Sequence, residues 1–275
     1  MSEARKGYSL MVARFPGNNQ EHPRSSGYLI DLQEKLLTDE RISAIVPFCK
    51  SDTPITMVRN EACRRALDMG VDYILMVDSD MEPDCEPGAP PFWDVAWDFM
   101  MARREAEEAS HLSAKKKFAK FPPATIAAPY CGPPPRELVY VFRWAQDATG
   151  EANLEFSPQM YDRDHAATLS GISEVAALPT GLILYDARVF RYLPRPWFKY
   201  EFADEYESRK ATTEDVFQTR NASLMGMPQF CAWDCWAGHI KLKTVRKPAP
   251  LLVGTLRREF AEGVVRAARW ESEAK

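Results

Sequence analysis

The sequence predicts an α/β domain with a mostly parallel central sheet flanked by helices, and two observations lead to that prediction. An amphipathic helical pattern at 54–69 is followed by an apolar run at 73–77 without polar alternation. Such a run is typical of a strand buried on both faces of a parallel sheet. Short apolar runs also recur along the chain between helical patterns, and strand–helix–strand order gives right-handed crossover units.

The remaining elements follow in order along the chain. The expected strands are 8–13, 42–48, 73–77, 125–130, 138–144, 182–185 and 229–233, and the expected helices are 26–37, 54–69, 92–112 and 213–224. Thr53 is expected to cap the second helix, with Pro54 in its first turn and Gly70 at its end. Residues 146–170 are polar and predict a hairpin or a loop. Residues 1–250 are interpreted as one domain and 251–275 as a C-terminal helical extension.

Bulk composition narrows the class of protein. The chain has 275 residues, of which 45% are hydrophobic and 27% charged, so disordered and collagen-like classes are excluded. A net charge of -4 argues against a broad electrostatic grip on nucleic acid. No apolar run is long enough to predict a membrane span. The six cysteines are scattered, which favours a reducing, cytoplasmic compartment over a disulfide framework.

An acidic pair stands at the end of the strand predicted at 73–77. Asp78 and Asp80 follow it directly, and ligands of open α/β sheets bind at the carboxyl ends of strands. Residues two apart in an extended segment point the same way, so both carboxylates are expected to converge on one Mg²⁺ or Mn²⁺ ion. Such a cation neutralises charge on a leaving diphosphate. A solvated acidic loop is the alternative interpretation of the same motif.

A family resemblance appears in the same region. Residues 55–62, which contain Arg59 and Asn60, and residues 72–80, which end in Asp78-Ser79-Asp80, resemble the nucleotide-binding half of GT-A glycosyltransferases, especially those like family 2. The resemblance implies a GT-A fold and metal-bridged binding of a nucleoside-diphosphate sugar.

The resemblance also implies roles for individual residues. Asp80 would be the direct metal ligand, Asp78 would face the ribose or the water shell of the metal, and Arg59 would lie near the phosphates. The full set of expected nucleotide-sugar-binding residues is Ala13, Arg14, Asp52, Arg59, Asp78, Ser79, Gly181 and Lys241. Residues 14–24 and 49–52 depart from the usual family-2 pattern, so the nucleotide base is left open between UDP and GDP.

The second half of the chain contains further matches to that family. The turn at 179–182 resembles the glycine turn beside the donor sugar, which points to Gly181. Glu214 and Asp215 resemble the Glu-Asp pair of inverting enzymes, in which the aspartate is the general base. A carboxylate in the first turn of a helix is kept ionised by the helix dipole and can accept a proton. Acidic residues in first turns are also common helix caps.

Three late residues carry the remaining expectations. The resemblance implies that His239 completes a metal shell with Asp78 and Asp80, and that Lys241 contacts phosphates. A rival interpretation is zinc, because Cys231, Cys235 and His239 are spaced four apart. Trp197 lies in a proline-rich stretch and is a candidate for stacking on a sugar.

Together these features predict a metal-dependent glycosyltransferase. It would move a sugar from a UDP- or GDP-sugar to an acceptor hydroxyl, with Mn²⁺ or Mg²⁺ as cofactor, with inversion and with Asp215 as base. The acceptor could be a glycan, a metabolite, a protein or a hydroxymethylated DNA base. Three alternatives remain: a retaining GT-A transferase, a nucleotidyltransferase acting on sugar phosphates, and a binding module without activity.

Overall fold

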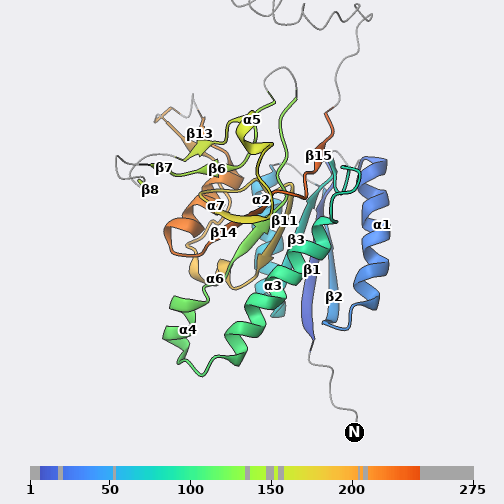
Figure 1. Cartoon of the computed structure of the whole chain (residues 1–275), viewed down its shortest axis with the longest axis vertical. Coiled ribbons are helices and arrows are strands. Elements are labelled where there is room, and N and C mark those ends of the chain that lie inside the picture. Colours follow the sequence, from blue (N-terminus) through green and yellow to red (C-terminus); the bar gives the residue numbers. More distant parts are fainter. Residues whose placement is uncertain are drawn as a thin grey trace, which may run out of the picture. The chain divides into compact units, whose positions relative to one another are not determined.

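A seven-stranded sheet forms the centre of the protein in a computed structural model (Figure 1). The structure describes residues 7–17, 21–51, 54–133, 137–146, 152–153, 158–203, 205–206 and 210–241. The expected extension at 251–275 therefore lies outside the described residues, and its helical character stays a prediction.

The strands of this sheet lie in the order β10-β14-β5-β11-β3-β1-β2. Their bounds are β1 Tyr8–Phe15, β2 Ile42–Cys49, β3 Tyr73–Asp78, β5 Thr125–Ala127, β10 Ile172–Val175, β11 Leu182–Asp186 and β14 Gln229–Ala232. β1 is parallel to β2 and β3, and β5 is parallel to β14, whereas β11 is antiparallel to β3 and β5 and β10 is antiparallel to β14. Five of the seven strands therefore run in one direction, which confirms the mostly parallel sheet.

Helices cover both faces of the sheet. They are α1 Pro23–Thr38, α2 Ile55–Met69, α3 Phe92–Ala109, α4 Ala114–Lys120, α5 Arg163–Ala166, α6 Val189–Tyr192 and α7 Glu214–Leu224. In Figure 1, α3 crosses in front of the sheet and α2 lies behind it. Short strand pairs lie outside the main sheet: β4 Met81–Glu82 with β15 Gly238–His239, β6 Phe142–Arg143 with β9 Gln159–Met160, β7 Ala145–Gln146 with β8 Ala152–Asn153, and β12 Glu201–Phe202 with β13 Lys210–Thr212.

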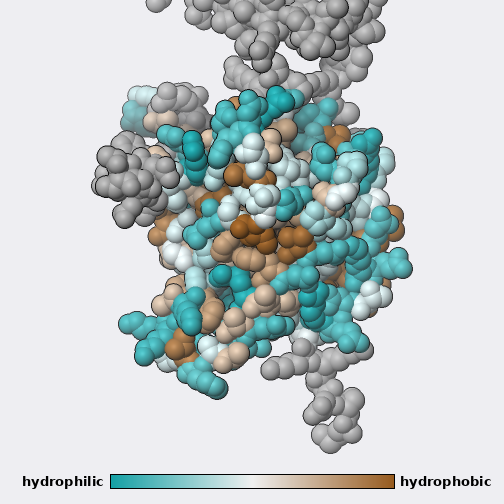
Figure 2. Space-filling model, viewed as in Figure 1, coloured by the Kyte–Doolittle hydropathy of each residue, from teal (hydrophilic) through white to brown (hydrophobic). Residues whose placement is uncertain are grey.

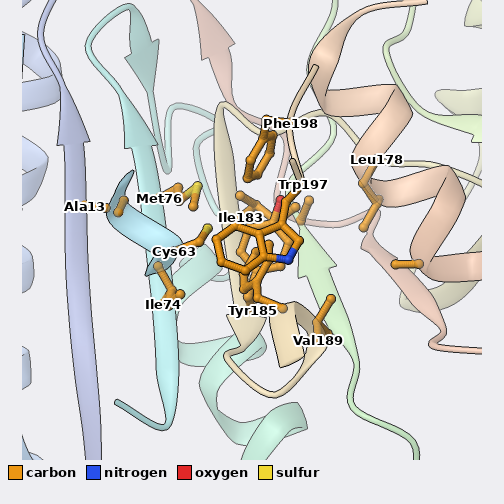
Figure 3. Packing of buried hydrophobic residues seen from close by; sticks show 14 of the residues in the cluster. Ala13, Cys63, Ile74, Met76, Leu178, Ile183, Tyr185, Val189, Trp197 and Phe198 are labelled. Atoms are coloured by element: carbon orange, nitrogen blue, oxygen red, sulfur yellow. The ribbon is translucent and has the colours of Figure 1, made fainter. Parts of the chain in front are cut away.

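The two faces of β3 belong to different hydrophobic clusters. Leu75 and Val77 pack in the cluster that includes α1 and α3, whereas Ile74 and Met76 pack with Cys63 and the rest of α2. Figure 3 shows the second of these clusters, with Met76 and Cys63 on neighbouring elements. The alternation along a strand then assigns the next even-numbered residue, Asp78, to the face of α2.

Local sequence signals account for most of these elements. Gly70 ends α2 in the left-handed conformation with φ 69°, which glycine adopts without steric cost. Pro54 occupies the N-cap position of α2 instead of its first turn, and Thr53 lies outside the described residues. The strand expected at 138–144 is reduced to β6. β10 was not predicted, because its Ile-Ser-Glu-Val sequence at an edge of the sheet lacks a continuous apolar run.

Two further expectations concern the environment of the chain. No helix among the described residues is long and apolar enough to cross a membrane. All six cysteines are free thiols.

On the face seen in Figure 2, hydrophobic side chains gather near the middle and are surrounded by hydrophilic ones.

Candidate functional site

The site is built around the carboxyl end of β3. Asp78 is the last residue of this strand and lies in register with Phe15, the last residue of β1. The extended conformation stops there, because Ser79 and Asp80 form a turn. Asp78 and Asp80 are therefore not two residues of one extended segment, which was the premise for expecting their carboxylates to point the same way. Asp78 and Asp80 have separate sets of partners.

Asp78 belongs to a buried triad with Arg59 and Glu214. Arg59 Nη2 donates to both carboxylate oxygens of Asp78, at 2.8 and 2.7 Å, and Arg59 Nη1 donates to Glu214 Oε1 at 2.8 Å. The side chain of Arg59 is 4% exposed, and those of Asp78 and Glu214 are 22% and 11% exposed. One guanidinium from α2 therefore joins the end of β3 to the first turn of α7.

The triad shows how burial and charge oppose each other. Burial raises the pKa of Asp78 and of Glu214, and the Arg59 guanidinium offsets part of both shifts. The pKa of Arg59 itself is raised, because the two carboxylates outweigh the effect of burial, which acts in the opposite direction. The carboxylates of the triad thus depend on Arg59 for their charged state.

Asp80 belongs to a second group, here called the open cluster, with His239 and Lys241. Asp80 Oδ2 lies 3.3 Å from His239 Nε2 and 2.5 Å from Lys241 Nζ. The pairing of β15 with β4 brings these late residues beside the turn, and Ile240 N donates to Asp80 O at 2.7 Å. The side chains of Asp80 and Lys241 are 39% and 42% exposed. Burial tends to raise the pKa of Asp80, but hydrogen bonds from His239 and Lys241 lower it to about 2.

The tautomer of His239 follows from its other nitrogen. His239 Nδ1 lies 3.1 Å from the carbonyl oxygen of Cys131. A carbonyl only accepts hydrogen bonds, so Nδ1 carries a proton. Nε2 faces Asp80 and can either donate a second proton to that carboxylate or, without this proton, present a lone pair to a cation shared with Asp80. In many metal-binding histidines, one ring nitrogen binds the metal and the other donates a hydrogen bond to a backbone carbonyl.

Asp215 and Gly181 flank the triad. Asp215 is the second residue of α7, and its Oδ1 accepts hydrogen bonds from Val216 N at 2.8 Å and from the hydroxyl of Thr213. Gly181 O accepts from Asp78 N at 2.8 Å. A Cβ at Gly181 would lie 2.7 Å from Met81 Sδ, so this position needs a glycine for space.

Tyr130 lies against this group and was not predicted. A Cβ at Gly181 would come within 2.9 Å of its ring, and the ring centroid is 4.9 Å from that of His239. Burial, together with the negative charges of Asp215, Asp78 and Asp80, raises the pKa of Tyr130 well above its ordinary value. The ring therefore stays a neutral part of the wall beside the carboxylates.

The first loop reaches the site through Ser79. Gly17 N donates to Ser79 Oγ at 3.2 Å, and His22 N donates to Ser79 O at 3.1 Å. Ala13 is fully buried within β1, and Arg14 pairs with Glu21 at 3.3 Å. The structure brings neither of these two side chains to the triad. Asp52 lies outside the described residues.

Among the described residues of the triad and the open cluster, together with Asp215, carboxylates outnumber cations. Four carboxylates, those of Asp78, Asp80, Glu214 and Asp215, face the guanidinium of Arg59 and the ammonium of Lys241. With His239 counted as neutral, two negative formal charges are left in excess within this group, which suits a divalent cation. Asp80 and His239 offer one oxygen and one nitrogen donor on the exposed side, and substrate phosphates and water commonly complete such a site. These residues fit a Mn²⁺ or Mg²⁺ ion.

The zinc interpretation fails in the structure. Cys231 lies within β14 and is fully buried, and His239 Nε2 faces Asp80. The helix that would have aligned the three side chains does not form. No group of three or more His, Cys, Asp and Glu residues in the described part of the chain is arranged to hold a metal ion. A cation at the open cluster would therefore have two protein ligands.

The proposed stacking role of Trp197 is wrong as well. Its side chain is buried in the core on the α2 face, and the indole Nε1 donates to Leu193 O at 3.2 Å (Figure 3). Asn60 holds this segment in place: Asn60 Oδ1 accepts from Trp197 N and Phe198 N, and Asn60 Nδ2 donates to Phe198 O. Arg59 and Asn60 are adjacent on α2 and bond to different segments, Arg59 to Asp78 and Glu214 and Asn60 to residues 197–198.

Comparison with known proteins leaves the function to be argued from these residues. No protein-family model and no curated protein matches the chain. A197 from STIV is similar with a TM-score of 0.49 and 13% identity over 89% of this chain and 100% of that one. GalNAc-T7, in a crystal structure with UDP, GalNAc and Mn²⁺, is similar with a TM-score of 0.41 and 10% identity, and the match covers 91% of this chain and 47% of that one. Neither likeness carries an argument about activity.

Proposed function

We propose that this chain is a metal-dependent glycosyltransferase that moves a sugar from a UDP- or GDP-sugar to an acceptor hydroxyl. The observation that supports it most is the excess of carboxylates at the carboxyl end of β3, where Asp80 Oδ2 and His239 Nε2 lie 3.3 Å apart on the exposed side. A divalent cation with its diphosphate completes both the charge and the coordination of such a site.

The residues around the cation have distinct parts in this proposal. Asp80 and His239 hold Mn²⁺ or Mg²⁺, which when bound stabilises the negative charge of the departing diphosphate. Asp78, fixed by Arg59, contributes its charge and not a direct bond, because no group of three His, Cys, Asp or Glu residues in the described part of the chain is arranged to hold a metal ion. Lys241 lies at the same exposed edge and binds the diphosphate once it leaves Asp80.

Asp215 is the general base of the proposed reaction. Its second carboxylate oxygen takes the proton of the acceptor hydroxyl as that oxygen bonds to the anomeric carbon. The bond from this carbon to the diphosphate oxygen breaks, and the nucleoside diphosphate leaves with the electron pair. Attack opposite the leaving group inverts the anomeric carbon. Asp215 stands in the first turn of α7, with its Oδ1 oriented by Val216 N and the hydroxyl of Thr213.

Thermal unfolding with ligands tests the donor and the metal. UDP-glucose and GDP-mannose are each added with Mn²⁺ and with EDTA, and one donor should raise the midpoint only with Mn²⁺. Asp80→Asn should abolish this shift. Asp94→Asn is a matched control, because Asp94 is a similarly exposed aspartate paired with a lysine, Lys35, on α1. Equal shifts in the wild type and Asp80→Asn would sink the proposal.

Product analysis separates the alternatives that share this site. Release of pyrophosphate from a nucleoside triphosphate with a sugar 1-phosphate would identify a nucleotidyltransferase instead. The anomeric configuration of the product, measured by NMR, distinguishes inversion from retention. A screen of glycans, small metabolites, peptides and hydroxymethylated DNA with the donor that binds would identify the acceptor class.

A further inference from the structure

Arg59 is fixed on every side by the protein. Its guanidinium lies 5.7 Å from the ring centroid of Phe15 and 6.0 Å from that of Phe198. Phe15 ends β1, and Phe198 is tied to α2 through Asn60. Aromatic side chains from two different segments thus lie against the guanidinium, which restricts its orientation.

The hydrogen-bonding groups of Arg59 are also turned inward. Both Nη atoms donate to carboxylates of the triad, and Nε is buried without a hydrogen bond to the described residues. The residue is 3% exposed. A phosphate ligand would need at least one of these donors at the surface, so the geometry does not suit the role that the resemblance implied for Arg59.

The bonds of Arg59 instead set the start of α7. Glu214 is the first residue of this helix, and Asp215 follows it directly. Asp215 is oriented by its own local contacts with Thr213 and Val216, so it moves with the first turn as a unit. The distance between Asp78 and the first turn of α7 is therefore fixed through one guanidinium.

We propose that Arg59 is a positioning residue that holds the first turn of α7, and with it Asp215, against the end of β3, and that it does not bind the donor phosphates. This inference rests on the proposed function, because it is in the proposed reaction that Asp215 acts as the general base. A fork with two separate Nη donors is needed to join two carboxylates in fixed directions, and the single ammonium of a lysine does not reproduce it.

A matched pair of conservative variants tests the inference. Arg59→Lys keeps the charge and loses the fork, and Arg188→Lys does the same to an arginine that bridges Asp186 and Glu107 at the other end of the sheet. The affinities for UDP with Mn²⁺ and for GDP with Mn²⁺ are measured by calorimetry. Hydrolysis of UDP-glucose and of GDP-mannose is followed as released nucleotide, and hydrogen exchange is measured on the amides of α7.

The expected result is a split between binding and turnover. Arg59→Lys should leave the nucleotide affinity within about threefold of the wild type, slow turnover at saturating donor by about tenfold to a hundredfold, and speed exchange in the first turn of α7. Arg188→Lys should change neither the nucleotide affinity, nor the turnover, nor the hydrogen exchange of α7. Glu214→Gln, which keeps the shape of the side chain, should show the same pattern to a smaller extent and serves if Arg59→Lys does not fold.

The outcomes separate this inference from the proposed function. Loss of nucleotide affinity of about tenfold or more in Arg59→Lys, with α7 unchanged, would make Arg59 a phosphate ligand and overturn the inference. Unchanged exchange in α7 in both site variants would overturn it as well. If the wild type binds and hydrolyses neither donor, the proposed function fails, and the exchange measurement still decides whether Arg59 positions α7.

Discussion

Two arginine bridges stand at opposite ends of β3 and its neighbour β11. At the carboxyl end of β3, Arg59 joins Asp78 to Glu214. At the other end, where Asp186 lies in register with Tyr73, Arg188 joins Asp186 to Glu107 with contacts of 2.6 and 2.8 Å. Each bridge uses one guanidinium to hold two carboxylates from different elements, so the local chemistry is the same.

The surroundings of the two bridges differ in charge. Near Arg188, two more arginines on α3, Arg103 and Arg104, face Asp186 or Glu107, and Arg104 also pairs with Glu108. Three arginines therefore share the carboxylates there, which include Glu174 as well as Asp186, Glu107 and Glu108. At the Arg59 end, Asp80 and Asp215 add two carboxylates to the two of the triad, and among the described residues Arg59 and Lys241 are the lysine and arginine side chains that pair with this group. Balanced charges stabilise a fold, whereas an excess of one sign attracts a ligand.

The largest expected effect is on stability when either bridge is removed. Arg59→Met leaves two buried carboxylates without their partner and should lower the free energy of unfolding by about 3–5 kcal/mol. Arg188→Met should cost less, because Arg104 and Arg103 still face Glu107 and Asp186, and because the side chain of Arg188 is 26% exposed, compared with 4% for Arg59. Urea unfolding of both metal-free variants measures this. An equal or larger loss in Arg188→Met would contradict the contrast in burial.

A second test concerns how tightly the Arg59 end is packed. Gly181→Ala places a methyl group 2.7 Å from Met81 Sδ and 2.9 Å from the Tyr130 ring, which should cost about 1–3 kcal/mol. Gly27→Ala in α1 meets no atom within 4 Å and should raise stability by about 0.4–1 kcal/mol, because alanine favours helix. The same unfolding assay compares them. If Gly181→Ala leaves the free energy of unfolding unchanged, the side chains of Met81 and Tyr130 can move aside at little cost.

A smaller effect is expected from Lys241, which competes with a cation for Asp80. Lys241→Met removes that ammonium and should tighten Mn²⁺ binding by about fivefold, since an exposed charge pair contributes about 1 kcal/mol. The same variant should weaken UDP binding in the presence of Mn²⁺. Titration followed by the EPR signal of free Mn²⁺ measures the first effect. Lys35→Met is the control, because Lys35 pairs with Asp94 away from the site.

The smallest effect is the dependence of stability on pH through Asp80. Its folded pKa of about 2 is below the unfolded value of about 3.9, so its carboxylate adds stability above about pH 4 and loses this as pH falls toward 2. In EDTA, the difference in unfolding free energy between the wild type and Asp80→Asn should shrink over that range. A difference that grows as pH falls would show that the folded pKa is not lowered.

Patterns within single elements were predictable from the sequence. The buried strand at β3, the amphipathic face of α2 and the stop at Gly70 follow from periodicity and from the conformational freedom of glycine. The place of the acidic motif at the end of β3 was predictable as well, because Asp78 directly follows the apolar run 73–77. The short β10 did not, because a half-exposed edge strand has too few apolar residues to be recognised.

Contacts between distant segments were not predictable in the same way. Arg59 and Glu214 are 155 positions apart, and Asp80 and Lys241 are 161 apart. Asp78 and Asp80 have separate partners, because the strand ends at Asp78 and a turn at 79–80 follows, where the alternation rule for strands no longer applies. Trp197 was placed at the surface because its prolines indicate a loop, whereas packing against the core buries it.

The sequence by itself determined the main strands and helices, the mostly parallel sheet and the acidic edge at β3, because these depend on the spacing of residues within short segments. Only the tertiary structure decided that Asp78 is closed off by Arg59 and Glu214 while Asp80 stays open beside His239 and Lys241. Which side chains meet across the fold depends on how α2, α7 and β15 pack at one edge of the sheet, and periodicity carries no information about that.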